Sequence, residues 1–286
     1  MTAITQSVAD CRTAVGHLSR FEVLPVGRSE EEAAQLDQPV RLAITCSPKH
    51  GPDRSVEMAR RLCALGHAVT VHLAARMVRD RAHLDELLAA LAEIGVDDLF
   101  VIGGDATPPH GPYSSAGDVL PEIREHAQRP RRLGIAGYPE GHPLIDPATL
   151  ADALERKSAL ADYVTTQLCF DPEKVLAWIR SSREAGVTLP VLVGAPGAVD
   201  RRKLLEISMR IGVGPSLSFL RKQRGLRNLL GRSRAAADAV HDALAPCLDD
   251  PRLGLCGFHY YTFNQLVDTW AWETEKGEHR TLVAHG

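Results

Sequence analysis

The chain has 286 residues, of which 44% are hydrophobic and 24% charged, and its formal net charge is -3. These values are typical of a globular protein, and the slight negative charge argues against a nucleic-acid-binding surface. No apolar run approaches the ~20 residues needed to cross a bilayer. We therefore expect neither a nucleic acid nor a membrane as partner.

Residues 1–16 are polar and lack the apolar centre of a signal peptide. The six cysteines are irregularly spaced, and none forms a C-x-x-C pair. We expect free thiols rather than disulfide bonds or a zinc site. Together these features predict a cytoplasmic protein.

Apolar runs that are typical of strands recur along the whole chain. They lie at residues 21–25, 41–47, 68–74, 99–106, 133–140, 163–170, 190–196 and 253–261. Residues 99–102 are continuously apolar, as expected for a strand that is buried on both faces of a parallel sheet. The run 99–106 ends in Gly103-Gly104-Asp105, where the glycines would let a bulky ligand approach the backbone.

Helical patterns separate these runs. Apolar spacing predicts helices at 55–65 and 81–94, each closed by a glycine, and another at 118–128. Asp146-Pro147 and Asp171-Pro172 each predict a helix start, with Asp as N-cap and Pro at the first helical position. Further helices are expected across 200–248, with a break at 212–215, and at 264–272.

Eight strands alternating with helices over this length favour an α/β fold, a closed (β/α)8 TIM barrel. An open doubly wound sheet is the alternative, and the lack of G-x-G-x-x-G after the first strand weakens it. We expect a single barrel domain over residues 19–280, preceded by a short N-terminal extension over residues 1–18.

Unusual polar side chains follow the predicted strands, at or near their carboxyl ends. They are Glu22, Thr45, His72, Asp105, Tyr138, Gln167 and Tyr261. Barrel active sites are built from this rim. No metal-ligand spacing or nucleophile elbow accompanies them, so we expect no metal. Hydrogen-bonding groups mixed with one or two acids suit a polar heterocycle such as a flavin or a pterin.

The two acids of this set each have a second interpretation. A carboxyl group buried in an apolar strand has a raised pKa, which suits Glu22 as a general acid. The alternative places Glu22 on the outer face of an edge strand. Asp105 lies where a ligand-binding edge is expected, and the alternative is that it caps the following segment.

Five short motifs, in this order and spacing, resemble the 5,10-methylenetetrahydrofolate reductase family in its bacterial single-domain form. They are FExxP from Phe21, GD from Gly104, YPExHP from Tyr138, TQxxFD from Thr166 and FHxYTxN from Phe258. The resemblance spans residues 21–272. It implies a (β/α)8 barrel that reduces 5,10-methylenetetrahydrofolate to 5-methyltetrahydrofolate, with NAD(P)H as hydride donor and FAD as cofactor. The resemblance is compatible with a homo-oligomer. It is also compatible with a role in methionine biosynthesis or in a demethylation pathway.

The resemblance also implies roles for individual residues. Glu22 matches the general acid that protonates N10 of the folate, and Asp105 matches an acid beside pterin and flavin whose charge would stabilise the cationic iminium. Residues that match FAD contacts are Thr45, His72, Gly104, Asp105, Tyr138, His142 and Lys157. Expected substrate contacts are Asp105, Gln167, Tyr261 and Gln265.

Three positions depart from the family pattern. Near the seventh strand, Lys203 aligns with a folate-binding glutamine of the family. Gly103 stands where the family usually has an arginine before Gly-Asp, which removes one FAD contact. Gln265 stands where an arginine usually follows Asn264. Two alternatives to the flavoenzyme therefore remain: a flavin-independent reductase with direct hydride transfer from NADH, and a non-redox folate-binding barrel.

Overall fold

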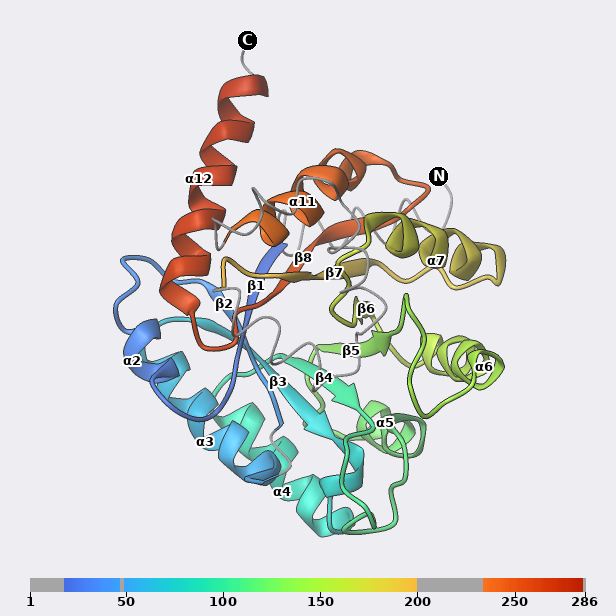
Figure 1. Ribbon diagram of the computed structural model, residues 1–286. Coiled ribbons are helices and arrows are strands. Elements are labelled where there is room, and N and C mark those ends of the chain that lie inside the picture. The colour runs from blue at the N-terminus through green and yellow to red at the C-terminus, as the bar shows by residue number, and fades with distance from the viewer. Residues whose placement is uncertain (1–17, 47–48, 200–233, 285–286) are drawn as a thin grey trace.

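The computed structural model describes residues 18–46, 49–199 and 234–284 (Figure 1). Eight parallel strands close into a barrel in chain order, and β1 pairs with β8. This closure confirms the predicted (β/α)8 barrel. It also excludes the open sheet, since an open sheet leaves its two edge strands unpaired.

The strands are short and the helices lie outside them (Figure 1). The strands are β1 Leu18–Val23, β2 Arg41–Ile44, β3 Ala68–Ala74, β4 Asp98–Ile102, β5 Arg132–Gly137, β6 Tyr163–Thr166, β7 Val191–Pro196 and β8 Leu255–Tyr261. The helices are α2 Ser29–Ala33, α3 Gly51–Ala64, α4 Arg81–Glu93, α5 Ala116–Glu125, α6 Pro147–Ser158, α7 Pro172–Glu184, α11 Ala235–Leu244 and α12 Leu266–Ala284, with short 3-10 turns η1 Ala75–Met77 and η2 Ala245–Asp249.

The predicted helix starts at the two Asp-Pro pairs are confirmed. The Asp146 side chain accepts a hydrogen bond from the Thr149 N–H at 3.0 Å, and Asp171 caps α7 in the same way through Glu173. The capping alternative for Asp105 is wrong, because the N-cap of the next helix, α5, is Ser115.

Several predicted boundaries differ from the structure. Strand β6 ends at Thr166, four residues before the end of the predicted run 163–170, because the chain turns away from the sheet to begin α7. Helix α3 begins at Gly51 rather than at residue 55, and α12 continues to Ala284. The expected extension 1–18, apart from Leu18, and most of the expected helix 200–248 lie outside the described residues.

The core lies between the barrel and the helices. Leu42, Ile44 and Val193 are at most 1% exposed, as expected for strands buried on both faces. Trp272 of α12 packs edge-on against Tyr260 of β8, with ring centroids 5.3 Å apart. Beyond that contact α12 runs away from the barrel (Figure 1).

The register between the first and last strands sets which side chains meet. Glu22 pairs with Tyr261, and Arg20 pairs with His259. Side chains two residues apart on a strand share a face, so Arg20 and Glu22 lie on one face of β1, as His259 and Tyr261 do on β8. This register brings Glu22 close to His259.

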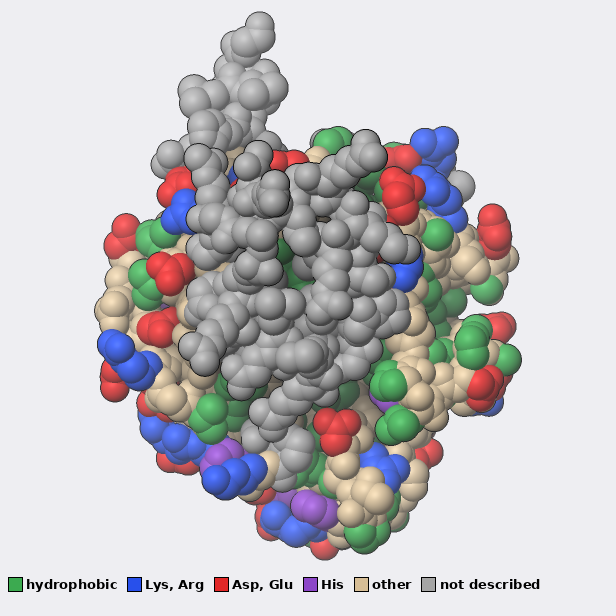
Figure 2. Space-filling view, in the orientation of Figure 1, with side chains coloured by type: hydrophobic (Ala, Val, Ile, Leu, Met, Phe, Trp, Pro, Cys, Tyr) green, Lys and Arg blue, Asp and Glu red, His purple; other side chains and the backbone are tan. Residues whose placement is uncertain are grey.

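The surface carries both signs of charge. Around the coloured part of the face in Figure 2, acidic and basic side chains alternate rather than forming one large patch. Within the described ranges, no helix is both long and apolar enough to cross a membrane.

Candidate active site

The centre of the candidate site is a pair formed by Glu22 and His259. The Nε2 atom of His259 lies 3.1 Å from Oε2 of Glu22, which is hydrogen-bonding distance. The His259 side chain is 2% exposed and the Glu22 side chain 14% exposed. Glu22 is therefore neither outward-facing nor on an edge strand, and that alternative is wrong because the barrel has no edge.

Burial gives these groups unusual acidities. It raises the pKa of Glu22 to about 7, against a smaller opposing effect of His72. It lowers the pKa values of His72 and His259 to about 3, so both imidazoles are neutral near pH 7. A carboxyl group with a pKa near 7 can carry a proton at neutral pH and release it, as a general acid must.

His72 of β3 completes a small cluster inside the barrel. Its ring stacks on His259, with ring centroids 6.1 Å apart, and packs against Phe100 at 4.7 Å. Its Nε2 atom is buried and has no hydrogen-bond partner among the described residues. This atom is available to a polar group of a ligand.

Glu22, His72 and His259 offer ligand atoms that all lie within 4.8 Å of one another. Sequence spacing could not show this group, because its members come from β1, β3 and β8. The two imidazole rings are stacked, with planes 27° apart. His259 already contacts the carboxyl group through Nε2. We interpret the group as a proton-holding cluster.

The turn after β8 holds the end of β1 in place. The Thr262 hydroxyl donates to the backbone carbonyl of Glu22 at 2.5 Å. Asn264 accepts from the Leu24 N–H at 2.9 Å and donates to the Val26 carbonyl at 2.8 Å. Phe263 and Asn264 have φ values of 49° and 60°, a left-handed conformation that is unusual for a bulky residue. This turn fixes the position of Glu22.

Two tyrosines and an aspartate lie with Glu22 at the carboxyl end of the barrel: Tyr138, Tyr261 and Asp105. Burial raises the pKa of Tyr261 well above its usual value, and the charge of Glu22 adds to the effect. Burial also raises the pKa of Tyr138, assisted by the nearby charge of Asp105. Asp105 itself is exposed. His142 packs edge-on against Tyr138, with centroids 5.4 Å apart.

Other predicted site residues lie on the rim with different contacts. Gln167 accepts a hydrogen bond from the Leu168 N–H at 2.8 Å, so its carbonyl oxygen faces its own backbone. The hydroxyl of Thr45 is buried and has no partner in the part of the chain that the structure describes. Burial lowers the pKa of Lys157 on α6. Gln265 is partly buried in the turn before α12.

Sequence reasoning placed His259 in a motif but did not select it as a site residue. The signal was its position two residues before Tyr261, which puts both on the same face of a strand. The contact with Glu22 depends on the pairing of β1 with β8, which no local pattern reveals.

The rim has groups that suit a flavin. Thr45 and His72 were both predicted as flavin contacts, and each keeps a buried polar atom without a partner among the residues described. Gly104 adopts φ +84°, and a Cβ there would lie 2.7 Å from the Cβ of Ala74. A cofactor with a polar heterocycle fits this donor and acceptor set.

A family model described as methylenetetrahydrofolate reductase matches residues 39–202, more than half of the chain. Methylenetetrahydrofolate reductase (NADH) 1 of Arabidopsis thaliana is 24% identical over 202 residues, which cover 63% of this chain and 33% of that protein. Methylenetetrahydrofolate reductase 1 of Schizosaccharomyces pombe is 27% identical over 119 residues, 39% of this chain and 20% of that protein. The chain thus spans a third or less of the length of these relatives.

A solved structure supports the fold. It is described as an uncharacterized protein from Clostridium thermocellum that binds two copies of 5-methyl-5,6,7,8-tetrahydrofolic acid. Its TM-score is 0.60 at 13% identity, and the match covers 91% of this chain and 92% of the other.

Proposed function

Because the chain belongs to the methylenetetrahydrofolate reductase family, we propose that it reduces 5,10-methylenetetrahydrofolate to 5-methyltetrahydrofolate, with FAD as cofactor and NAD(P)H as hydride donor. The observation that carries the proposal is the buried Glu22 carboxyl group, whose pKa is raised to about 7 and which His259 contacts at 3.1 Å. The Arabidopsis relative is named for NADH and a Caenorhabditis elegans relative for NADPH, so relatives of this chain are named for either nucleotide.

Glu22 has the properties that the first step needs. Reduction of the methylene carbon requires that the five-membered ring open, and protonation of N10 makes that nitrogen a leaving group. A protonated Glu22 donates this proton, and its ionised form can be reprotonated in the next cycle. Since His259 is neutral and lies at hydrogen-bonding distance, it holds the carboxyl group in position without taking its proton permanently.

Asp105 and the two tyrosines surround the positive charge that forms when the folate ring opens. Opening of the ring leaves a cationic iminium, and a carboxylate close to it stabilises that charge. Asp105 is the acid at the mouth, close to Tyr138. The Tyr261 hydroxyl donates to the Thr166 carbonyl at 3.3 Å, so this ring is fixed beside Glu22 as a wall for the pterin.

When bound, FAD would carry the hydride from NAD(P)H to the methylene carbon. We assign its polar contacts to Thr45, His72 and Tyr138, and we propose Gly104 as a further contact because the resemblance to the family implies it. Lys157 is a partly buried cation on α6, which suits an anionic phosphate. His142, Gln167 and Gln265 are proposed contacts on the same rim.

Gly103 favours one alternative, direct hydride transfer from NADH without flavin. A non-redox folate-binding barrel is the other. The visible absorption spectrum of the purified protein, before and after addition of FAD, separates them. The flavin proposal predicts bands near ~450 nm that bleach with NAD(P)H and return with methylenetetrahydrofolate.

A colourless protein that does not bind added FAD would contradict the flavin proposal. An assay of NADH oxidation with methylenetetrahydrofolate then distinguishes the remaining two. Turnover without flavin supports direct hydride transfer, whereas tight folate binding without any oxidation supports the non-redox barrel.

A further inference from the structure

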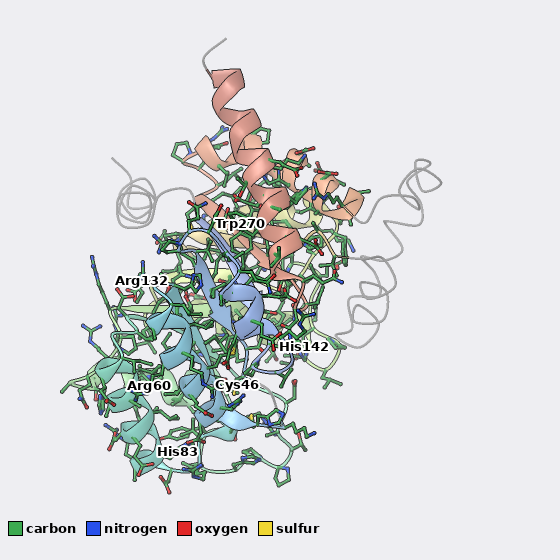
Figure 3. All side chains as sticks on the ribbon, turned by 90° about the vertical axis from the view of Figure 1, so that its left-hand side faces the viewer. Cys46, Arg60, His83, Arg132, His142 and Trp270 are labelled. Carbon is green, nitrogen blue, oxygen red and sulfur yellow. The ribbon has the colours of Figure 1, made fainter. Side chains whose placement is uncertain are left out.

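A second polar pocket lies at the opposite end of the barrel from the candidate active site. Its cavity volume is about 230 Å³, and its charged lining comes from the amino-terminal ends of four strands and a preceding loop. The charged residues are Arg20, Arg41, Asp97, Asp98 and Arg132. Figure 3 shows Arg132, at the start of β5, and His142, which follows β5, on opposite sides of the barrel.

The arginine at the centre is almost completely buried. Arg20 donates from Nη2 to Asp98 at 2.7 Å and from Nη1 to the Tyr163 hydroxyl at 2.9 Å. The Tyr163 hydroxyl in turn donates to Asp98 at 2.8 Å. The Arg20 side chain is only 4% exposed, and its Nε atom is buried without an acceptor in the described ranges.

Arg132 repeats this pattern. Its Nη2 donates to Asp97 at 3.1 Å, whereas its Nε is buried and lies 3.7 Å from Asp98, too far for a hydrogen bond. Two residues that line this pocket, Arg20 and Arg132, therefore each have a buried Nε–H group without an acceptor among the described residues. Buried donors of this kind usually have a partner, such as an ordered water or an ion.

The charges in the pocket do not balance. Among the described residues that line it, three guanidinium groups face two carboxylates, an excess of one positive charge within that part of the lining. His67 adds none, because its Nδ1 accepts a hydrogen bond from the Val40 N–H at 3.2 Å. Burial lowers the pKa of Arg41, and the positive charges of Arg132 and Arg20 lower it further.

We propose that this pocket binds a tetrahedral oxyanion of the phosphate class. Planar guanidinium groups with free N–H donors are the groups that proteins use to bind phosphate. The cavity is smaller than the ~300–1,000 Å³ pockets that hold drug-sized ligands, so it suits a phosphate group rather than a second cofactor. The anion would join β1, β2 and β5 at the amino-terminal end of the barrel. This site is independent of the proposed reductase activity.

Thermal unfolding in the presence of inorganic phosphate tests the proposal on the full chain. Ionic strength is held constant with sodium chloride, so that only specific binding changes the midpoint. A ligand that binds only the folded state raises the unfolding midpoint in a saturable manner. We expect such saturation for the wild-type protein, and 31P line broadening with the same concentration dependence.

Three variants decide whether the arginine pocket is responsible. Arg41→Gln removes a pocket cation outside the Arg20–Asp98–Tyr163 network, and should weaken phosphate binding by about tenfold or more. Asp97→Asn removes a carboxylate from the pocket and should tighten binding. Arg60→Gln is the matched control, because Arg60 is an exposed arginine on α3 that pairs with Glu93 outside the pocket.

A purely structural arginine cluster gives a different result. In that case phosphate has no saturable effect, or it affects wild type and Arg41→Gln equally, and either outcome overturns the proposal. Adenosine 5′-phosphate in place of inorganic phosphate identifies the source. Equal binding means that the pocket admits the phosphate group of a larger molecule, and binding of inorganic phosphate alone means that it takes the free ion.

Discussion

Glu22 on β1 and His259 on β8 lie with Oε2 and Nε2 3.1 Å apart, although they are separated by 237 positions in the chain. The pair is buried beside His72, and the Thr262 hydroxyl binds the backbone of Glu22. The position of one ionisable carboxyl group is therefore controlled by the last strand of the barrel.

Replacing Glu22 with Gln should remove the proton donor without changing the size of the side chain. Reduction of methylenetetrahydrofolate should fall by about 10²–10⁴-fold, the usual contribution of a general acid. Oxidation of NAD(P)H by another acceptor should stay near the wild-type rate, because it needs no proton on N10. Stopped-flow measurement of the two half-reactions checks this. A parallel loss of both would show that Glu22 has a different role.

The folate half-reaction should depend on pH. Glu22 acts in its protonated form, and burial raises its pKa to about 7, so the rate should fall as the pH rises through about 7. The NAD(P)H half-reaction should lack this transition. The Glu22 contribution to the free energy of unfolding should also fall as the pH rises. Because the pKa of Glu22 is higher in the folded state, its protonation stabilises the folded state below the unfolded pKa, and this stabilisation is lost as the pH rises through about 7. Glu22→Gln should remove the Glu22 contribution to both profiles.

His259→Leu should change the pH profile more than the affinity for folate. It removes the imidazole that can donate a hydrogen bond to the ionised carboxylate, so the pKa of Glu22 should rise. The pH at which the rate declines should therefore shift upward. His259→Gln keeps an N–H donor on a side chain of similar reach, and should restore part of the wild-type profile. Identical profiles for wild type and His259→Leu would contradict a positioning role.

Gly103→Arg should strengthen FAD binding. A Cβ at residue 103 meets nothing within 4 Å, so the first atom of the new side chain has room, and the arginine restores a cation that the related family usually has there. Gly104→Ala is the contrasting variant, because its Cβ would lie 2.7 Å from Ala74 and its φ is +84°. We expect tighter FAD binding for the first and weaker binding for the second, measured by quenching of flavin fluorescence. Unchanged affinity in Gly103→Arg would place the cofactor elsewhere.

Asp98→Asn should destabilise the barrel strongly. Asp98 is the buried partner of Arg20, and removal of one member of a buried ion pair costs about 3–5 kcal/mol. Glu93→Gln is the control, since its pair with Arg60 is exposed and salt-screened and should contribute little. Chemical denaturation at equilibrium compares the two variants. Similar midpoints would show that the Arg20–Asp98 pair is not needed for stability.

The alternation of strands and helices that favours a barrel could be predicted from local patterns in the chain. Apolar runs separated by helical spacing specify strands and helices locally, and the Asp-Pro pairs mark helix starts because their capping bonds join residues two or three positions apart. The carboxyl-rim position of Glu22 and Asp105 followed from the same patterns, since parallel strands place all their carboxyl ends at one edge.

Local patterns could not predict which side chains meet inside that barrel, because these contacts depend on strand pairing. The contact of Glu22 with His259 depends on closure between β1 and β8, and the arginine pocket depends on the register of β1, β2, β4 and β5. Strand register is set by packing between residues far apart in the chain, and a shift of one residue would turn these side chains to the other face. Burial then raises the pKa of Glu22, a property that exists only once the barrel has closed around it.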